Sequence, residues 1–143
     1  MTSPVRAVGQ VLLGSVLVLA GVAHLTYART EFQAQVPPWF PADADLVVLV
    51  SGVVEVLVGA ALLVTWRHPA RAGVGLATAA LFVAVFPGNI AQLTEHRDAF
   101  GLTSDTARAI RLLFQPVLVV WAVWSTGAWR WWRQRRVTAE RRS

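Results

Sequence analysis

Glu55 is the residue with the clearest chemical potential, because it lies in the middle of an apolar run from Leu46 to Trp66 that carries no other charge. A carboxylate at the centre of a membrane span costs about 2.5–3.5 kcal/mol on insertion scales, so it is expected to be paired or used. Arg111, the cation inside a later apolar segment, is the expected partner. A carboxyl group kept neutral by desolvation, or ionised beside an arginine, can act as a general acid or base.

Further polar side chains fall at comparable depth in the other apolar segments. Counting 1.5 Å per helical residue places most of them in the outer half of the predicted bundle, away from the chain termini. Ser51 and Glu55 are four residues apart, as are Arg111 and Gln115, so each pair shares a helix face. We therefore expect a polar pocket that opens outward. The expected catalytic residues are Glu55, His24 and Arg111, and the expected substrate-binding residues are Ser51, Asn89, Gln92 and Gln115.

A structural role is the alternative interpretation for the same residues. Glu55 and Arg111 could form a buried ion pair that only fixes helix register. Asn89 and Gln115 could join helices through hydrogen bonds worth about 0.6 kcal/mol each, and His24 could be a structural residue near the interface. No metal site is expected, because the chain has no cysteine and its three histidines are spread over both ends of the predicted bundle.

The composition places these residues in a membrane protein. Of 143 residues, 55% are hydrophobic and only 15% are charged, against about 25% charged residues in soluble domains. Four apolar segments each approach the ~20 residues that cross ~30 Å of hydrocarbon. The sequence thus predicts an all-α, integral membrane bundle of four transmembrane helices, forming one domain over residues 1–129. The expected spans are 5–27, 45–66, 70–93 and 104–129, followed by a basic tail at 130–143.

Capping residues and prolines indicate where these helices begin and where they are irregular. The candidate N-caps of the second and fourth spans are Asp43 or Asp45, and Ser104 or Asp105. Pro87 and Pro116 lie inside the third and fourth spans and are expected to release backbone carbonyls there. The loop between the first two spans contains three prolines around Trp39 and Phe40, which exclude a regular helix through that part.

The distribution of arginine predicts the orientation in the membrane. One side carries Arg6, Arg67, Arg71 and the six arginines from Arg130 onward, whereas most acidic residues fall on the other side. By the positive-inside rule both termini are expected to be cytoplasmic, in a multi-pass protein of the cell membrane. The same rule accounts for the net charge of +5, so nucleic acid is not an expected partner.

Five short motifs, in this order, resemble those of the DoxX-like family of small membrane proteins. They are Gly21-Val-Ala-His24, Pro37-Pro38, Ser51-Gly-Val-Val-Glu55, Phe86-Pro-Gly-Asn89-Ile90 and Arg111-x-x-x-Gln115-Pro116, within about residues 8–120. The resemblance implies a four-helix fold and an association with quinone-linked sulfur oxidation or with membrane assemblies that handle thiol or oxidative stress. The matching positions are His24, Glu55, Asn89, Arg111 and Gln115. Because the chain has no cysteine, thiol chemistry would have to come from a partner or a substrate.

Three functions are compatible with these observations. The first is an accessory subunit of a membrane redox system, with a redox partner protein and a quinone or similar lipophilic molecule bound in the outer pocket. The second is a stand-alone membrane enzyme of the isomerase or cyclase type that uses Glu55 as acid or base on a lipophilic substrate. The third is a structural or small-solute transport role. A chain of 143 residues would have to form a homo-oligomer to work as an alternating-access transporter. The sequence itself contains no cofactor motif.

Overall fold

The computed structural model describes residues 3–140, which are mostly helical and contain no β-strand. Four helical segments are long and apolar enough to cross a membrane: Pro4–Leu25, Ala44–Val64, Ala70–Thr94 and Asp105–Thr126. Their outward faces expose large apolar side chains such as Leu19, Leu57 and Val120, as expected of helices surrounded by lipid. These segments confirm the predicted all-α bundle and indicate a multi-pass membrane protein.

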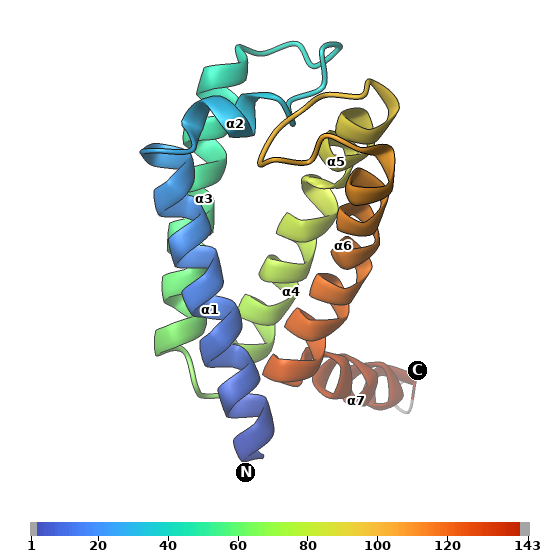
Figure 1. Ribbon diagram of the computed structural model, residues 1–143. Helices are drawn as coiled ribbons and strands as arrows, with labels where there is room; N and C mark the ends of the chain where they lie inside the picture. The colour runs from blue at the N-terminus through green and yellow to red at the C-terminus, as the bar shows by residue number, and fades with distance from the viewer. Residues whose placement is uncertain (1–2, 141–143) are drawn as a thin grey trace.

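The helices form two layers that meet along the bundle axis (Figure 1). The first layer pairs α1 with α3, and the second places α4 and α5 along α6. The N-terminus of α1 and the whole of α7 lie at one end of the bundle, called here the terminal end, and α2 lies at the opposite, loop end. The bounds are α1 (Pro4–Leu25), α2 (Arg29–Gln33), α3 (Ala44–Val64), α4 (Ala70–Ala84), α5 (Phe86–Thr94), α6 (Asp105–Thr126) and α7 (Ala128–Glu140).

Local signals in the sequence account for most helix boundaries. Asp43 accepts a hydrogen bond from the backbone N–H of Leu46 at 3.0 Å, and Ser104 accepts one from that of Ala107 at 3.2 Å. Of the two candidates at each helix start, the N-caps are therefore Asp43 rather than Asp45, and Ser104 rather than Asp105. The third span is broken between α4 and α5, with Pro87 in the first turn of α5. In contrast, Pro116 lies within the continuous helix α6. The expected tail begins as helix α7, and its residues 141–143 lie outside the described part of the chain.

Glycines allow α1 and α3 to approach until their backbones touch. A Cβ atom on Gly21 would lie 2.5 Å from the carbonyl oxygen of Gly52, and one on Gly59 would lie 2.8 Å from that of Gly14. The two pairs are seven residues apart on each helix, so one contact line runs along the interface. This close packing, typical of membrane helices with small residues at the interface, fixes the rotation of α1 against α3.

A polar network that the sequence did not predict joins four helices, α1, α3, α4 and α6, at the terminal end. The side chain of Gln10 on α1 is fully buried; its Nε2 donates to the carbonyls of Leu62 at 2.7 Å and Thr65 at 3.0 Å, at the end of α3. Its Oε1 accepts from Nε of the buried Arg71 at 2.6 Å, and Arg71 also donates to the carbonyl of Ser125 at 2.9 Å. Arg71, counted above among the orienting charges of a turn, is therefore a buried structural residue. The available signal was the lone glutamine, Gln10, in an aliphatic segment, together with an arginine at the second position of α4.

Candidate functional site

A cavity of about 370 Å³ lies between the two layers in the half of the bundle nearer the loop end. Its lining is mostly apolar and comes from α1, α3, the junction of α4 and α5, α6 and the segment that follows α2. Below it, the buried side chains of Leu13, Leu17, Leu62 and Phe82 fill the bundle towards the terminal end. Six of the seven predicted site residues line the cavity: His24, Ser51, Glu55, Asn89, Arg111 and Gln115.

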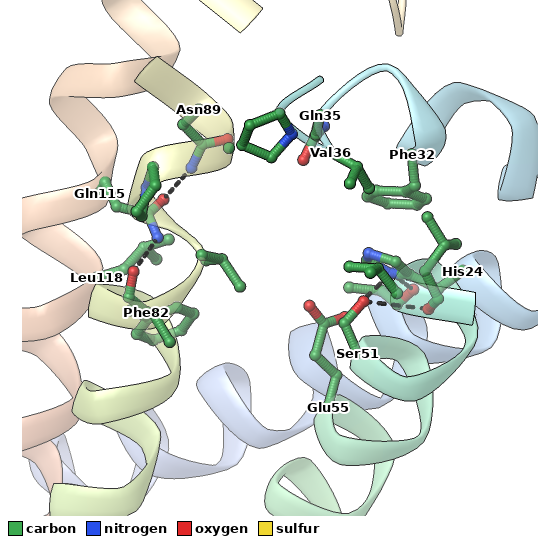
Figure 2. Close-up of a pocket in the computed structure, with 18 of the residues that line it drawn as sticks. His24, Phe32, Gln35, Val36, Ser51, Glu55, Phe82, Asn89, Gln115 and Leu118 are labelled. Atoms are coloured by element: carbon green, nitrogen blue, oxygen red, sulfur yellow. Dashed lines mark hydrogen bonds and ion pairs between the residues drawn. The ribbon is translucent and has the colours of Figure 1, made fainter. Parts of the chain in front are cut away.

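One wall of the cavity holds two buried ionisable groups side by side (Figure 2). The Nδ1 atom of His24 lies 3.1 Å from Oε2 of Glu55 and 2.8 Å from the carbonyl oxygen of Ala20. A carbonyl oxygen only accepts hydrogen bonds, so we assign His24 the tautomer in which Nδ1 carries a proton and donates a hydrogen bond to the carbonyl of Ala20. Glu55 Oε2, although buried and close to the imidazole, has no hydrogen bond to any of residues 3–140. Glu55 lines the cavity, so its carboxylate lies beside the space that a bound molecule would occupy.

The opposite wall is built from amide side chains at the break between α4 and α5 (Figure 2). Gln115 on α6 donates from Nε2 to the carbonyl of Phe82 at 2.7 Å, and its Oε1 accepts from Nδ2 of Asn89 at 3.0 Å. The helix interruption at Val85 gives α6 access to a backbone carbonyl of α4, which side chains commonly satisfy where membrane helices break. Asn89 and Gln115 therefore join helices, as the structural interpretation predicted, while they also line the cavity.

The predicted ion pair between Glu55 and Arg111 does not form. Arg111 donates from Nη1 to Oε1 of Gln92 at 3.0 Å, and its guanidinium lies 5.1 Å from the centre of the Phe100 ring. Both ionisable residues line the same cavity, but from different layers. Spacing along a helix does not fix its rotation against a neighbour, and here the contact between α1 and α3 gives Glu55 the closer partner His24.

Gln92 is not part of the cavity lining, and its role in binding a substrate stays a prediction. It is buried and holds the guanidinium of Arg111, so it acts as a positioning residue. Ser51 lines the cavity, and its hydroxyl donates a hydrogen bond to the carbonyl of Val48 at 3.1 Å.

Within residues 3–140, no group of three or more histidine, cysteine, aspartate or glutamate side chains is arranged to hold a metal ion.

Sequence analysis did not identify the residues that close the loop end of the cavity. Residues 32–40 cover it, and we call this segment the cover. Within it the ring of Phe32 stacks on His24 with a centroid distance of 3.3 Å, and Nε2 of Gln35 is buried without a hydrogen bond in the described part of the chain. Helix α2 is tied to α3 through Arg29 and Gln33, which both bind Asp45. The Pro37-Pro38-Trp39-Phe40 stretch was the available signal, because an apolar, proline-rich loop is suited to packing.

A family model that describes a domain of unknown function (DUF8561) matches residues 13–126. The chain belongs to the DUF8561 family. The matched region of this DUF8561 protein contains all seven predicted site residues, the glycine contacts of α1 with α3, and the cover. No curated protein and no solved structure matches the sequence.

Alanine at Gly88 is expected to displace the cover of this DUF8561 protein. A Cβ atom there would lie 2.4 Å from the carbonyl oxygen of Gln35, a backbone atom that cannot move without the rest of the segment. Overpacking of this kind costs about 1–3 kcal/mol. Hydrogen exchange of the amides of residues 32–40 should therefore accelerate. The control is Gly73→Ala on α4, where no atom lies within 4 Å of the added Cβ; equal exchange in the two variants would show that the cover does not depend on this contact.

Proposed function

We propose that this protein binds a small lipophilic molecule of the quinone class in the cavity and serves as an accessory subunit of a membrane redox system. The observation that carries the proposal is that two buried polar atoms of residues lining this mostly apolar cavity, the acceptor Glu55 Oε2 and the donor Gln35 Nε2, have no hydrogen bond within residues 3–140. Buried polar atoms without a partner cost about 1–3 kcal/mol each, so a ligand that supplies both partners gains affinity from each of them.

A quinone fits this chemistry at both oxidation levels. Its carbonyl oxygens accept hydrogen bonds, which Gln35 and the cavity-lining guanidinium of Arg111 can donate. The hydroxyls of the reduced quinol donate, and Glu55 can accept from one of them. The volume of about 370 Å³ lies within the range of small-molecule sites, about 300–1,000 Å³, and apolar walls with a few polar groups are typical of such sites.

The adjacent His24 and Glu55 are proposed to move protons to and from the ligand. Reduction of a quinone to a quinol takes up two electrons and two protons. In this proposal each proton comes from the aqueous phase by way of His24 in its imidazolium form. His24 passes the proton to Glu55, which lies 3.1 Å away, and Glu55 passes it to the ligand oxygen. The two electrons come from a redox partner protein that binds the subunit. The resemblance to DoxX-like proteins, which implies quinone-linked chemistry, supports this assignment, as does the placement of the resembling motifs around one cavity.

The distribution of arginines supports one orientation of the bundle in the cell membrane, which is part of this proposal. The terminal end carries Arg6, Arg67 and the arginines of α7. By the positive-inside rule this end faces the cytoplasm, and the cavity opens in the outer half.

A second candidate function, a stand-alone isomerase or cyclase, is favoured by the same buried His24–Glu55 pair, which is a suitable acid–base couple. The two functions differ in one respect: the enzyme converts its substrate when purified alone, whereas the accessory subunit requires its partner.

Ligand binding tests the proposal directly. The protein is extracted in its own lipids and examined by native mass spectrometry, and it is then titrated anaerobically with decylubiquinone and decylubiquinol while tryptophan fluorescence is recorded, since Trp39 lines the cavity. We expect a lipophilic adduct on the wild type. In Glu55→Gln, quinol binding should weaken about tenfold, because a charge-assisted hydrogen bond is roughly twice as strong as a neutral one and tenfold corresponds to about 1.4 kcal/mol.

Two further variants make the result interpretable. Gln35→Leu removes the donor on the cover and should weaken quinone binding, and Glu95→Gln neutralises an exposed carboxylate outside the cavity and should leave both affinities unchanged. Thermal unfolding of each variant checks that the fold is retained. If Glu55→Gln and Glu95→Gln bind both probes equally, the cavity is not a quinone site and its polar groups hold helices together.

A further inference from the structure

A second pocket, of about 480 Å³, lies at the terminal end of the bundle and plays no part in the proposed redox function. It is built where four separate parts of the chain meet: the start of α1, the turn between α3 and α4, the first turn of α4, and α7 with the residues that precede it. The lining residues that matter here are Arg6, Trp66, His68, Arg71, Arg130 and Trp131. The first and last of these elements are about 120 residues apart in sequence, so only the fold brings them together.

The pocket is strongly basic. Three arginines line it, and none of its lining residues in the described part of the chain is acidic. The Nη1 atom of Arg6 is buried and has no hydrogen-bond partner among residues 3–140. Arg6 lies 5.9 Å from the ring centre of Trp124, and Arg71 lies 5.5 Å from that of Trp66, so aromatic rings support both guanidinium groups.

The pKa of His68, a residue of the turn between α3 and α4, is lowered by burial and by the same excess of positive charge. Burial lowers the pKa of His68 below its ordinary value, and the neighbouring charges of Arg71 and Arg130 lower it further. An anion in the pocket would act in the opposite direction on this histidine. A buried guanidinium N–H without an acceptor and a histidine held towards its neutral form both indicate a place that lacks a negative charge.

We propose that this pocket binds a phosphate group, and that it thereby recognises the headgroup of an anionic phospholipid or a soluble phosphate ester. Arginine presents paired N–H donors that match phosphate oxygens, which makes it the usual residue for such recognition. The pocket lies where α1 and α4 begin and α6 ends, at the level at which a span meets lipid headgroups. Trp66 and Trp131 belong to the residue type that favours this interface.

The test compares removal of charge inside the pocket with removal of charge outside it. Arg6→Gln/Arg130→Gln removes two donors of the pocket, and Arg133→Gln removes one charge from an exposed position of α7 outside it. Native mass spectrometry counts lipids bound from phosphatidylglycerol or phosphatidylcholine, and calorimetry measures binding of glycerol 3-phosphate. Charged hydrogen bonds contribute about 1.5–3 kcal/mol each, so the double variant should bind at least tenfold more weakly. The single variant Arg130→Gln replaces the double variant if the latter does not fold.

Each outcome has a defined meaning. If the wild type and Arg133→Gln selectively retain phosphatidylglycerol and the double variant loses it, the site is supported and the bound phosphate belongs to a lipid headgroup. If the same pattern appears only with glycerol 3-phosphate, the site is supported and the bound phosphate belongs to a soluble ester. In either case NMR titration of His68 should show its pKa rising when the ligand binds. Equal binding of both probes by the double variant and by Arg133→Gln would overturn the proposal.

Discussion

Gly21→Ala is expected to destabilise the protein by about 3 kcal/mol, at the upper end of the usual range for overpacking. The added Cβ would lie 2.5 Å from the carbonyl oxygen of Gly52 and 2.8 Å from the backbone nitrogen of Val56. Both are backbone atoms of α3, so the clash is relieved only if α1 and α3 separate. Separation also removes contacts along the whole interface, because the pair Gly14 and Gly59 lies on the same line.

Thermal unfolding in detergent, followed by circular dichroism, measures this effect. The matched control is Gly73→Ala, which adds the same Cβ to a helix at a position with no atom within 4 Å. That change should be neutral or stabilising by up to about 1 kcal/mol, since alanine favours a helix more than glycine does. If the two variants unfold at the same temperature, the close packing of α1 on α3 is not what holds this layer together.

The Gly21 variant should also affect the cavity. His24 lies one turn beyond Gly21 on α1, and its position 3.1 Å from Glu55 depends on the same helix contact. A shift of α1 therefore separates the two ionisable groups before it unfolds the bundle. Under conditions in which Gly21→Ala remains folded, we expect it to bind the quinol probe more weakly than Gly73→Ala does.

Gln10→Met is the second substitution with a large expected effect. Methionine keeps the length of the side chain but removes two donated hydrogen bonds to the end of α3 and the acceptor for Arg71. The carbonyls of Leu62 and Thr65 lie at a helix C-terminus, where carbonyls have no partner within their own helix. Leaving buried polar groups unpaired costs about 1–3 kcal/mol each, more for a charged one. We expect a loss of about 3 kcal/mol in the free energy of unfolding.

A double-mutant cycle with Arg71→Met isolates the bond between the two side chains. Residues in direct contact couple by about 0.5–3 kcal/mol, whereas independent sites add. The double variant should therefore be less destabilised than the sum of the single variants. Strict additivity would mean that the 2.6 Å contact between Gln10 and Arg71 contributes no stability of its own. Quinone binding in the folded Gln10 variant should be unchanged, because this network lies at the other end of the bundle.

The sequence alone determined the number of spans, several boundaries and the general location of the polar residues. Hydrophobic segments of about 20 residues, the candidate N-caps Asp43 or Asp45 and Ser104 or Asp105, and the irregularity at Pro87 are local properties, set by backbone chemistry within a few residues. Counting depth along each helix also placed the polar residues in the same half of the bundle, since the rise per residue of a helix is constant.

Tertiary structure decided which of these residues touch. Glu55 meets His24 and not Arg111, and Gln92 supports Arg111 from outside the cavity. Phe32 and Gln35 cover the cavity, a role that loop composition did not predict. Helical periodicity fixes neighbours on one helix but leaves its rotation against another helix open. That rotation is set by contacts such as Gly21 with Gly52 and Gln10 with Arg71, which join residues 31 and 61 positions apart and exist only once the helices have packed.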